Sequence, residues 1–277
     1  MLGGSDGGLG ALLMTNSYGE IWRLQGDVES RDAHVVRRAL NRGQMVHFTM
    51  GRTFNNDELL RRYYDELVEA VGEPIDIAED YRQGGAPTGQ RWSEIRYDAD
   101  VPDDVAFRYS KNAQPLHTDE SYVSTGAGIM LFYCVTPAPS GGETVFVRGT
   151  SLVEHLEVAA PELLERLTGM KVRYSKAGDY KELPIIQTFD DGTVELNYNY
   201  YCVDADQSAD AVQLNEDFHR YLQEKLPRKL IVPVGLKRGE AVAWRDSAVL
   251  HGRNAFEAHE SGDRFIWKTG IRLELTA

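Results

Sequence analysis

The sequence is poor in cysteine, in positive charge and in long apolar runs, and each shortage excludes a class of protein. Only two of its 277 residues are cysteines, Cys134 and Cys202. Both lie in apolar, strand-like stretches, so we predict reduced, buried thiols rather than a disulfide, as is usual in the cytoplasm. Neither has a cysteine or histidine partner at zinc-finger spacing, which argues against a structural zinc site.

Acidic residues outnumber basic residues by 43 to 30, which gives a formal net charge of −13 at pH 7. A nucleic-acid or membrane-surface binder needs a basic surface, so neither partner is expected. No apolar run approaches the roughly 20 residues that span a bilayer, and the N-terminus lacks the pattern of a signal peptide. We therefore expect a cytoplasmic protein, while the net charge does not identify a substrate. Whether it forms a homo-oligomer stays open.

The length suits one large domain or two small ones, and no internal repeat or interdomain linker divides the chain. Residues 1–13 are rich in glycine and predict a flexible leader. Met14 is a more natural start, so these residues could be foreign to the native chain or come from a misplaced start. We therefore predict a single domain over residues 14–277.

Local patterns predict short strands with helices inserted among them. Apolar residues recur at helical spacing over 56–71, and further helices are expected over 32–40, 151–158, 161–167 and 215–226. The predicted strands cover 18–24, 45–48, 107–109, 116–119, 129–135, 143–147, 172–174, 185–189, 194–200, 230–233, 241–244, 248–251 and 265–275. Many short strands separated by Gly- and Pro-rich turns indicate a mainly β protein, either a β-sandwich or a jelly roll.

Two stretches are predicted to be loops that cover a binding site. Residues 78–104 are polar and rich in Gly, Asp and Pro, so we expect a long loop there. A loop of this length in a compact domain is often an active-site lid. Residues 175–184 are a second predicted lid.

The strongest functional signal is His117 with Asp119, taken together with His251 far downstream. On a β-strand, side chains two residues apart face the same side, so His117 and Asp119 project together while Thr118 points away. Two histidines and one carboxylate on one face of a metal ion leave the opposite positions open, which is typical of non-haem Fe(II) oxygenases. A His-x-Asp pair alone is weak, because an exposed histidine beside a surface acid is just as common.

Two segments carry a family resemblance, QPLHTDESYVSTGAGIMLFYCVTPAPSGGETVFVRG and AVAWRDSAVLHGRNAFEAHESGDRFIWKTG. They resemble the taurine dioxygenase (TauD/TfdA) family of Fe(II)- and 2-oxoglutarate-dependent dioxygenases, over roughly residues 105–275. The resemblance implies a mainly β fold with inserted helices, a double-stranded β-helix (jelly roll, cupin-like, clavaminate synthase-like). It also implies that His117, Asp119 and His251 are the iron ligands and catalytic residues.

The resemblance further implies two residues for 2-oxoglutarate. Thr144, after a Gly-Gly turn, would bind one carboxylate, and Arg264 would form a salt bridge with the other. A planar guanidinium pairs bidentately with a carboxylate, which favours Arg264 on chemical grounds as well. Many relatives carry a second arginine where this chain has Lys268. Lysine keeps the positive charge but lacks the planar guanidinium that can bind a carboxylate bidentately. Lys268 and Arg272 are the alternatives to Arg264 for binding this carboxylate of 2-oxoglutarate.

Other residues near the ligands are predicted to shape the site. Tyr109 and Asn112 before the first ligand, Tyr122 after the second, and Lys268 are the predicted substrate contacts. Arg245 and Asp246, near the distal histidine, are interpreted as a structural ion pair.

The predicted function is an Fe(II)- and 2-oxoglutarate-dependent dioxygenase. It would use O2 to hydroxylate a C–H bond of a small polar metabolite, an amino acid or a natural-product intermediate, and release succinate and CO2. Related halogenases replace the metal-binding carboxylate with Gly or Ala, so Asp119 favours oxygenation. The alternatives are desaturation or cyclisation by the same chemistry, a non-catalytic jelly-roll protein that binds metal and ligand, and a zinc hydrolase.

Overall fold

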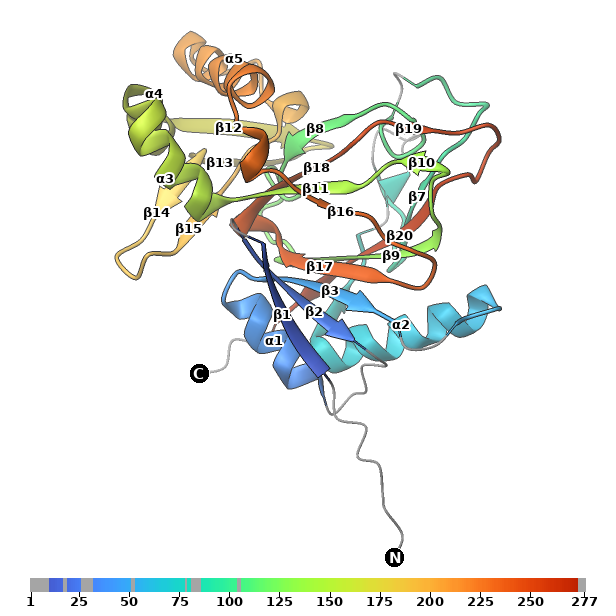
Figure 1. Cartoon of the computed structure of the whole chain (residues 1–277). Coiled ribbons are helices and arrows are strands. Elements are labelled where there is room, and N and C mark those ends of the chain that lie inside the picture. The colour runs from blue at the N-terminus through green and yellow to red at the C-terminus, as the bar shows by residue number, and fades with distance from the viewer. Residues whose placement is uncertain are drawn as a thin grey trace, which may run out of the picture.

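The fold, taken from a computed structural model, is mainly β with helices packed around the outside (Figure 1). The structure describes residues 10–16, 19–25, 32–50, 53–77, 79–80, 86–103 and 106–273. Residues 10–13 of the expected leader form the start of strand β1 (Gly10–Asn16), and residues 1–9 lie outside the described residues. In the described part of the chain, no helix is both long and apolar enough to cross a membrane.

The larger sheet has eight strands in the order β1-β2-β3-β17-β9-β20-β4, with β7 also pairing with β20. Its strands after β1 are β2 (Gly19–Gln25), β3 (Met45–Thr49), β4 (Glu73–Ile75), β7 (Ser93–Arg96), β9 (Ile129–Thr136), β17 (Ala241–Arg245) and β20 (Phe265–Arg272). Strands β2 and β3 run parallel, and the other pairs are antiparallel.

The smaller sheet has four antiparallel strands in the order β16-β11-β18-β8. They are β8 (Gln114–His117), β11 (Thr144–Arg148), β16 (Val232–Val234) and β18 (Val249–Arg253). The two sheets face each other across one apolar cluster, to which Phe132 and Trp244 contribute from the larger sheet and Phe146 from the smaller (Figure 1). Within the described residues neither sheet closes into a barrel.

Strand β9 shows why the larger sheet is covered on both faces. Its even-numbered residues 130–134 belong to the cluster between the sheets, and its odd-numbered residues 129–135 belong to a second cluster with the N-terminal helices. This alternation follows from the two-residue period of a strand. Because both faces are apolar, the strand is one uninterrupted hydrophobic run, IMLFYCV.

Helices cover the two outer faces. Helices α1 (Ala33–Asn41) and α2 (Asp57–Val71) pack on the larger sheet (Figure 1). Helices α3 (Gly149–Ala159), α4 (Pro161–Gly169) and α5 (Ala209–Glu224) join a third apolar cluster on the far side of the smaller sheet. Two hairpins lie beside them, β12 (Lys171–Lys176) with β13 (Asp179–Pro184), and β14 (Ile186–Thr188) with β15 (Val194–Leu196).

The remaining elements are short. Strand β5 (Glu79–Asp80) pairs with β6 (Ala86–Pro87), and β10 (Ser140–Gly141) pairs with β19 (Phe256–Glu257). Three 3-10 helices are η3 (Tyr200–Cys202), η4 (Arg228–Leu230) and η5 (Asp246–Ala248).

Helices α2 and α5 each begin after a residue whose side chain caps the backbone, but only the start of α2 was predicted closely. The Asn56 side chain accepts hydrogen bonds from the backbone N–H groups of Glu58 and Leu59, and α2 begins within one residue of its predicted start. Ser208 caps α5 in the same way, so this helix begins at Ala209, six residues before the predicted position. The first turn of α5, ADAV, buries only the small side chain of Ala211, so apolar periodicity alone missed it.

Three local predictions are wrong. The expected loop 78–104 contains β7, which pairs with β20, and the expected lid 175–184 is mostly the second strand of a β-hairpin. That hairpin turns at Ala177 and Gly178, both with positive φ. Residues 107–109, predicted as a strand, form a turn. Both missed strands are rich in polar residues; β7 pairs with the distant β20, whereas β13 pairs with the adjacent β12.

Candidate metal centre and its pocket

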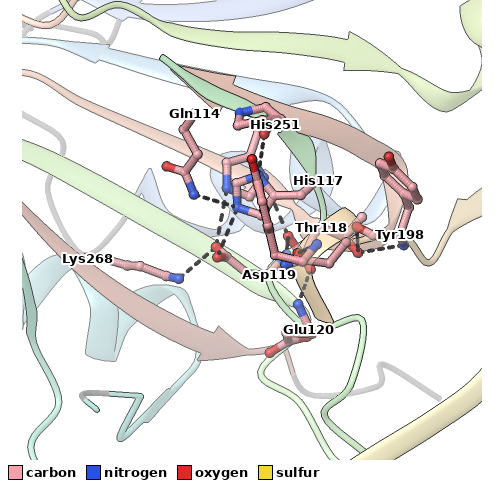
Figure 2. Close-up of polar contacts among 12 residues, drawn as sticks. Gln114, His117, Thr118, Asp119, Glu120, Tyr198, His251 and Lys268 are labelled. Carbon is pink, nitrogen blue, oxygen red and sulfur yellow. Dashed lines mark hydrogen bonds and ion pairs between the residues drawn. The ribbon is translucent and has the colours of Figure 1, made fainter. Parts of the chain in front are cut away.

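The smaller sheet and the turn after β8 bring His117, Asp119 and His251 together. His117 ends β8 and lies directly opposite His251 in β18. The two rings have centroids 4.3 Å apart. The Asp119 carboxylate lies against both, with Oδ1 3.7 Å from His117 Nε2 and Oδ2 3.4 Å from His251 Nε2 (Figure 2). One ligand atom from each residue lies within 4.8 Å of the others, a spacing that can hold a metal ion.

Thr118 points away from this group, as the strand period predicts. Its backbone N–H and its hydroxyl both donate to the carbonyl oxygen of Tyr198, and its hydroxyl oxygen accepts from the Tyr198 N–H. This exchange fixes the backbone between His117 and Asp119. The two ligand-type side chains therefore share one side although β8 ends at His117.

The charge states in the site suit a cation. Burial alone would raise the pKa of Asp119, but Lys268, His251 and the hydrogen bonds with both histidines outweigh it and hold the pKa well below its usual range. Burial, with His117 next, lowers the pKa of His251 to about 4. At neutral pH the site therefore presents an ionised carboxylate and a neutral imidazole, the forms that bind metal.

The donor set also fits Fe(II). His117 Nδ1 lies 2.9 Å from the Pro115 carbonyl oxygen, so Nδ1 carries the proton and Nε2 is the basic nitrogen. The side-chain amide of Gln114 donates to that Nε2 at 3.2 Å, in the position a metal would take (Figure 2). Two nitrogens and one carboxylate oxygen on one side of an open pocket are typical of Fe(II) rather than of a closed structural zinc site.

Thr144 and Arg264 lie on the same pocket as the three ligand-type residues, in a cavity of about 570 Å³. Thr144 begins β11 and is buried, and Arg264 precedes β20 with only 5% of its surface exposed. The Arg264 Nε–H donates to the Gly142 carbonyl oxygen at 3.3 Å. Burial lowers the pKa of Arg264 to about 10, so the guanidinium stays charged at neutral pH.

The Gly141-Gly142 turn allows the Arg264 side chain to approach the backbone at Gly142. Both glycines have φ of +75°, and a Cβ on Gly141 would lie 2.4 Å from the Ala255 carbonyl oxygen. A residue with a side chain would push β10 away from β19 and displace Thr144, which follows two residues later.

The predicted substrate contacts divide into two groups. Tyr122 and Lys268 line the pocket, whereas Tyr109 and Asn112 lie outside its lining. Lys268 Nζ is 2.7 Å from Asp119 Oδ2, so in this structure it pairs with a ligand-type carboxylate (Figure 2). Arg272, the other alternative to Arg264, instead pairs with Glu73 at an exposed position.

The predicted ion pair between Arg245 and Asp246 is wrong. Arg245 donates to the Leu40 carbonyl oxygen and to the Asn41 side chain. Asp246 is buried and accepts hydrogen bonds from the backbone of Asp119 and Glu120. Arg245 ends β17 and Asp246 begins the 3-10 turn η5, a change of structure that the sequence analysis did not predict.

Arg253 is a second residue whose role the sequence did not reveal. Its guanidinium donates to the carbonyl oxygens of Phe107, Ser110 and Asn112, and so holds the segment that carries Tyr109 and Asn112 against β18. Both cysteines are free, as predicted, but only Cys134 is buried, while Cys202 is half-buried at the pocket.

Residues 23–269 match the family described as taurine catabolism dioxygenase TauD, TfdA family, and the chain belongs to this family. The family predicted from the two sequence segments, a family of dioxygenases, is thereby confirmed.

Curated relatives are more distant. Mitochondrial trimethyllysine dioxygenase of Gallus gallus is 29% identical over 164 residues, 54% of this chain and 39% of that protein. γ-Butyrobetaine dioxygenase of Pseudomonas sp. (strain AK-1) is 25% identical over 62% of this chain and 45% of that protein. The chain therefore spans less than half the length of these two relatives. Uridine-5′-phosphate dioxygenase of Streptomyces sp. is 25% identical over 76% of this chain and 86% of that protein.

Solved structures share the fold. PvcB of Pseudomonas aeruginosa superposes with a TM-score of 0.65 at 17% identity, over 96% of this chain and 92% of its own. An asparagine oxygenase in complex with Fe(II), 3-hydroxyasparagine and succinate gives a TM-score of 0.66 at 13% identity, over 88% of this chain and 78% of its own.

Proposed function

We propose that this chain is an Fe(II)- and 2-oxoglutarate-dependent dioxygenase that hydroxylates a C–H bond of a small polar metabolite, such as an amino acid or a natural-product intermediate. The observation that carries the proposal is the convergence of His117, Asp119 and His251 on a pocket that also holds Thr144 and Arg264. A binding protein without catalysis would have no use for both co-substrate residues beside an open metal site.

We assign the iron ligands to Nε2 of His117, Nε2 of His251 and the carboxylate of Asp119. When bound, Fe(II) supplies the activation of O2 that is coupled to decarboxylation of 2-oxoglutarate to succinate and CO2. The chain contributes charge and geometry. Asp119 brings one negative charge, the imidazole of His251 stays neutral, and β8, β18 and the turn after β8 hold all three residues together.

Thr144 and Arg264 would bind the two carboxylates of 2-oxoglutarate. Both are buried, so a dianion there loses its water and needs charged and hydrogen-bonding partners in compensation. Arg264 offers a positive charge and a planar fork, while the Thr144 hydroxyl can donate one hydrogen bond.

The pocket wall favours a substrate that carries charges of both signs. Besides Asp119 it contains three acidic residues, Asp76, Glu120 and Asp179, and besides Arg253 and Arg264 it contains three basic residues, Arg108, Lys176 and Lys268. A wall of mixed charge suits an amino acid or another zwitterion better than a purely anionic or apolar molecule. Among the predicted contacts, Tyr122 and Lys268 line this pocket, and Tyr109 and Asn112 would shape it through the segment that Arg253 holds.

The fold assigned to this function is a double-stranded β-helix, with the two facing sheets as its core and residues 14–277 as one catalytic domain in the cytoplasm. The sheet pairing on both sides of a shared apolar cluster supports this assignment, as do the shared folds of the related oxygenases.

The test is anaerobic addition of Fe(II) and 2-oxoglutarate, followed by a scan for the weak visible charge-transfer band of the chelated co-substrate. We expect the band in the wild type and its loss in His251→Ala. On admitting air, 2-oxoglutarate should be converted slowly to succinate. A protein that binds metal without the band or succinate would instead be a binding protein or a zinc hydrolase.

A further inference from the structure

Asp246 is a buried carboxylate that contacts the backbone of one ligand-type residue and faces the ring of another. It begins η5, the 3-10 turn between β17 and β18, and only 2% of its surface is exposed. Its Oδ1 accepts a hydrogen bond from the Asp119 N–H at 3.1 Å, and its Oδ2 accepts one from the Glu120 N–H at 2.9 Å. Both oxygens are therefore used to hold the turn that carries Asp119.

The same carboxylate faces the buried nitrogen of His251. His251 Nδ1 is inaccessible to solvent and has no hydrogen-bond partner in the described part of the chain. Asp246 Oδ1 lies 3.9 Å away. Once Nε2 faces a metal, the imidazole proton must sit on Nδ1, and a buried N–H without an acceptor is unfavourable. A shift of less than 1 Å would close this distance to a hydrogen bond.

The other histidine already has such a partner. His117 Nδ1 lies 2.9 Å from the Pro115 carbonyl oxygen, which orients its ring from behind. In the described structure, Asp246 is the corresponding group for His251. Pro115 thus contacts His117, and Asp246 contacts both Asp119 and His251. Each of these contacts is made at an atom that does not face the metal position.

We propose that Asp246 is a positioning residue that sets the geometry of two of the three metal ligands, through the backbone of Asp119 and the ring of His251. This inference rests on the proposed function, because it takes the triad as the metal site. A carboxylate is suited to the role since its two oxygens can accept three N–H bonds. Asparagine has one acceptor oxygen, and its amide would meet one of these N–H groups with another donor.

Burial of the Asp246 carboxylate near two other acidic residues is energetically unfavourable, which argues that it has a functional role. Only 2% of Asp246 is exposed, and it lies against the turn that carries the acidic residues Asp119 and Glu120. Three acidic groups gathered in a buried region repel one another, and a divalent cation at the triad would relieve that repulsion.

The experiment measures metal binding to the full chain, independently of turnover. Co(II), whose visible spectrum reports ligand geometry, is titrated into the wild type, Asp246→Asn, Asp246→Ala and His251→Ala, alongside thermal melting of each. We expect Asp246→Asn to bind Co(II) about 10- to 100-fold more weakly and to give an altered spectrum. The Ala variant should bind no better.

The matched control is Asp65→Asn. Asp65 accepts hydrogen bonds from Arg91 and Trp92 at the outer face of the larger sheet. The control loses carboxylate contacts of the same kind and should keep wild-type Co(II) affinity, even if its melting temperature falls. A fall in melting temperature alone would therefore not count as a positioning effect.

The outcomes distinguish failure of the proposed function from failure of the positioning role of Asp246. If the wild type does not bind Co(II), or if His251→Ala binds it equally well, the proposed function fails. If wild-type binding depends on His251 but folded Asp246→Asn binds Co(II) with unchanged affinity and spectrum, the positioning role is overturned.

Discussion

Burial and neighbouring charges decide the charge state of each residue in the pocket. The same burial that lowers the pKa of His251 to about 4 also lowers the pKa of Arg264, yet only the histidine becomes neutral. The reason is the starting value, since a guanidinium remains charged after a shift that removes the charge of an imidazole. One buried pocket thus presents a neutral imidazole, that of His251, beside the fixed positive charge of Arg264.

Arg264→Met should weaken 2-oxoglutarate binding and leave metal binding nearly unchanged. A hydrogen bond to a charged group contributes about 1.5–3 kcal/mol, so the half-saturating 2-oxoglutarate concentration should rise roughly 10- to 150-fold. Titration of the charge-transfer band measures this. Arg272→Met, on β20 but paired with exposed Glu73, is the control and should behave as the wild type. An equal effect in both variants would move the role away from Arg264.

Glu240 should make stability depend on pH in the acid range. Its Oε2 lies 3.3 Å from His47 Nε2 and accepts from the Lys237 N–H at 3.0 Å. Burial alone would raise the pKa of Glu240, but these contacts outweigh it and lower the pKa below the usual value. The stabilisation is therefore present above the ordinary pKa of about 4.3 and is lost as the pH falls through the lowered value.

Urea denaturation at pH 7 and at pH 3 of the wild type and Glu240→Gln tests this. The free-energy difference between the two proteins should shrink at the lower pH. A difference that is the same at both pH values would show that the interaction does not depend on the ionised carboxylate.

At the scale of secondary-structure elements, the hairpin β12–β13 is attached to the segment that follows Asp119. Lys176 Nζ donates to the Tyr122 hydroxyl at 3.1 Å, and Lys181 Nζ donates to the Glu120 carbonyl oxygen at 2.8 Å. Near the hairpin turn, Asp179 Oδ2 accepts from the Ser124 N–H at 3.2 Å. Since Lys176 and Asp179 also line the pocket, the hairpin forms one wall of it.

Asp179→Ala should loosen this wall. We expect faster amide hydrogen exchange over residues 174–182 and a roughly 2- to 13-fold higher half-saturating substrate concentration, from the loss of about 0.5–1.5 kcal/mol. The substrate for the assay comes from a screen for metabolites that shift the charge-transfer band. Asp191→Ala, at the turn of the other hairpin, where the Asp191 carboxylate accepts from the Thr193 N–H, is the control. Unchanged exchange in Asp179→Ala would show that the contacts with Ser124 do not hold the hairpin.

The elements that the sequence predicts well are those with a complete local pattern. Helix α2 has an apolar face and an Asn56 cap, and β9 is a continuous apolar run, so both appear close to their predicted bounds. Strand β7 has the sequence SEIR, which carries no apolar run, and it exists because it pairs with β20. Its partner lies far away in the chain, and a local window cannot include it.

At the scale of the whole molecule, three apolar clusters are stacked through the two sheets. One lies between α1, α2 and the larger sheet, one between the sheets, and one between the smaller sheet and α3–α5 (Figure 1). Each sheet contributes residues to two clusters, because its strands alternate faces. His117 and His251 of the candidate metal centre belong to strands of the smaller sheet, so its geometry depends on the packing on both sides of that sheet.

This stacking predicts that the chain unfolds as one unit. Leu60→Ala in the first cluster and Leu214→Ala beyond the smaller sheet each remove a fully buried side chain and should each cost about 2–5 kcal/mol. Urea unfolding followed by far-ultraviolet circular dichroism and by tryptophan fluorescence should give coincident curves for both variants. Separate transitions would show that the helical layers fold independently and that 14–277 is not one domain.

The sequence by itself predicted the candidate ligand residues, the shared orientation of His117 and Asp119, the family and most of the buried strands and helices, because these depend on residue types and on patterns within single segments. The tertiary structure alone decided that His251 lies opposite His117, that Lys268 pairs with Asp119, and that Asp246 faces the ligands instead of pairing with Arg245. These contacts depend on strand register and on turns between sheets, which join residues far apart in the chain, and no local period encodes them.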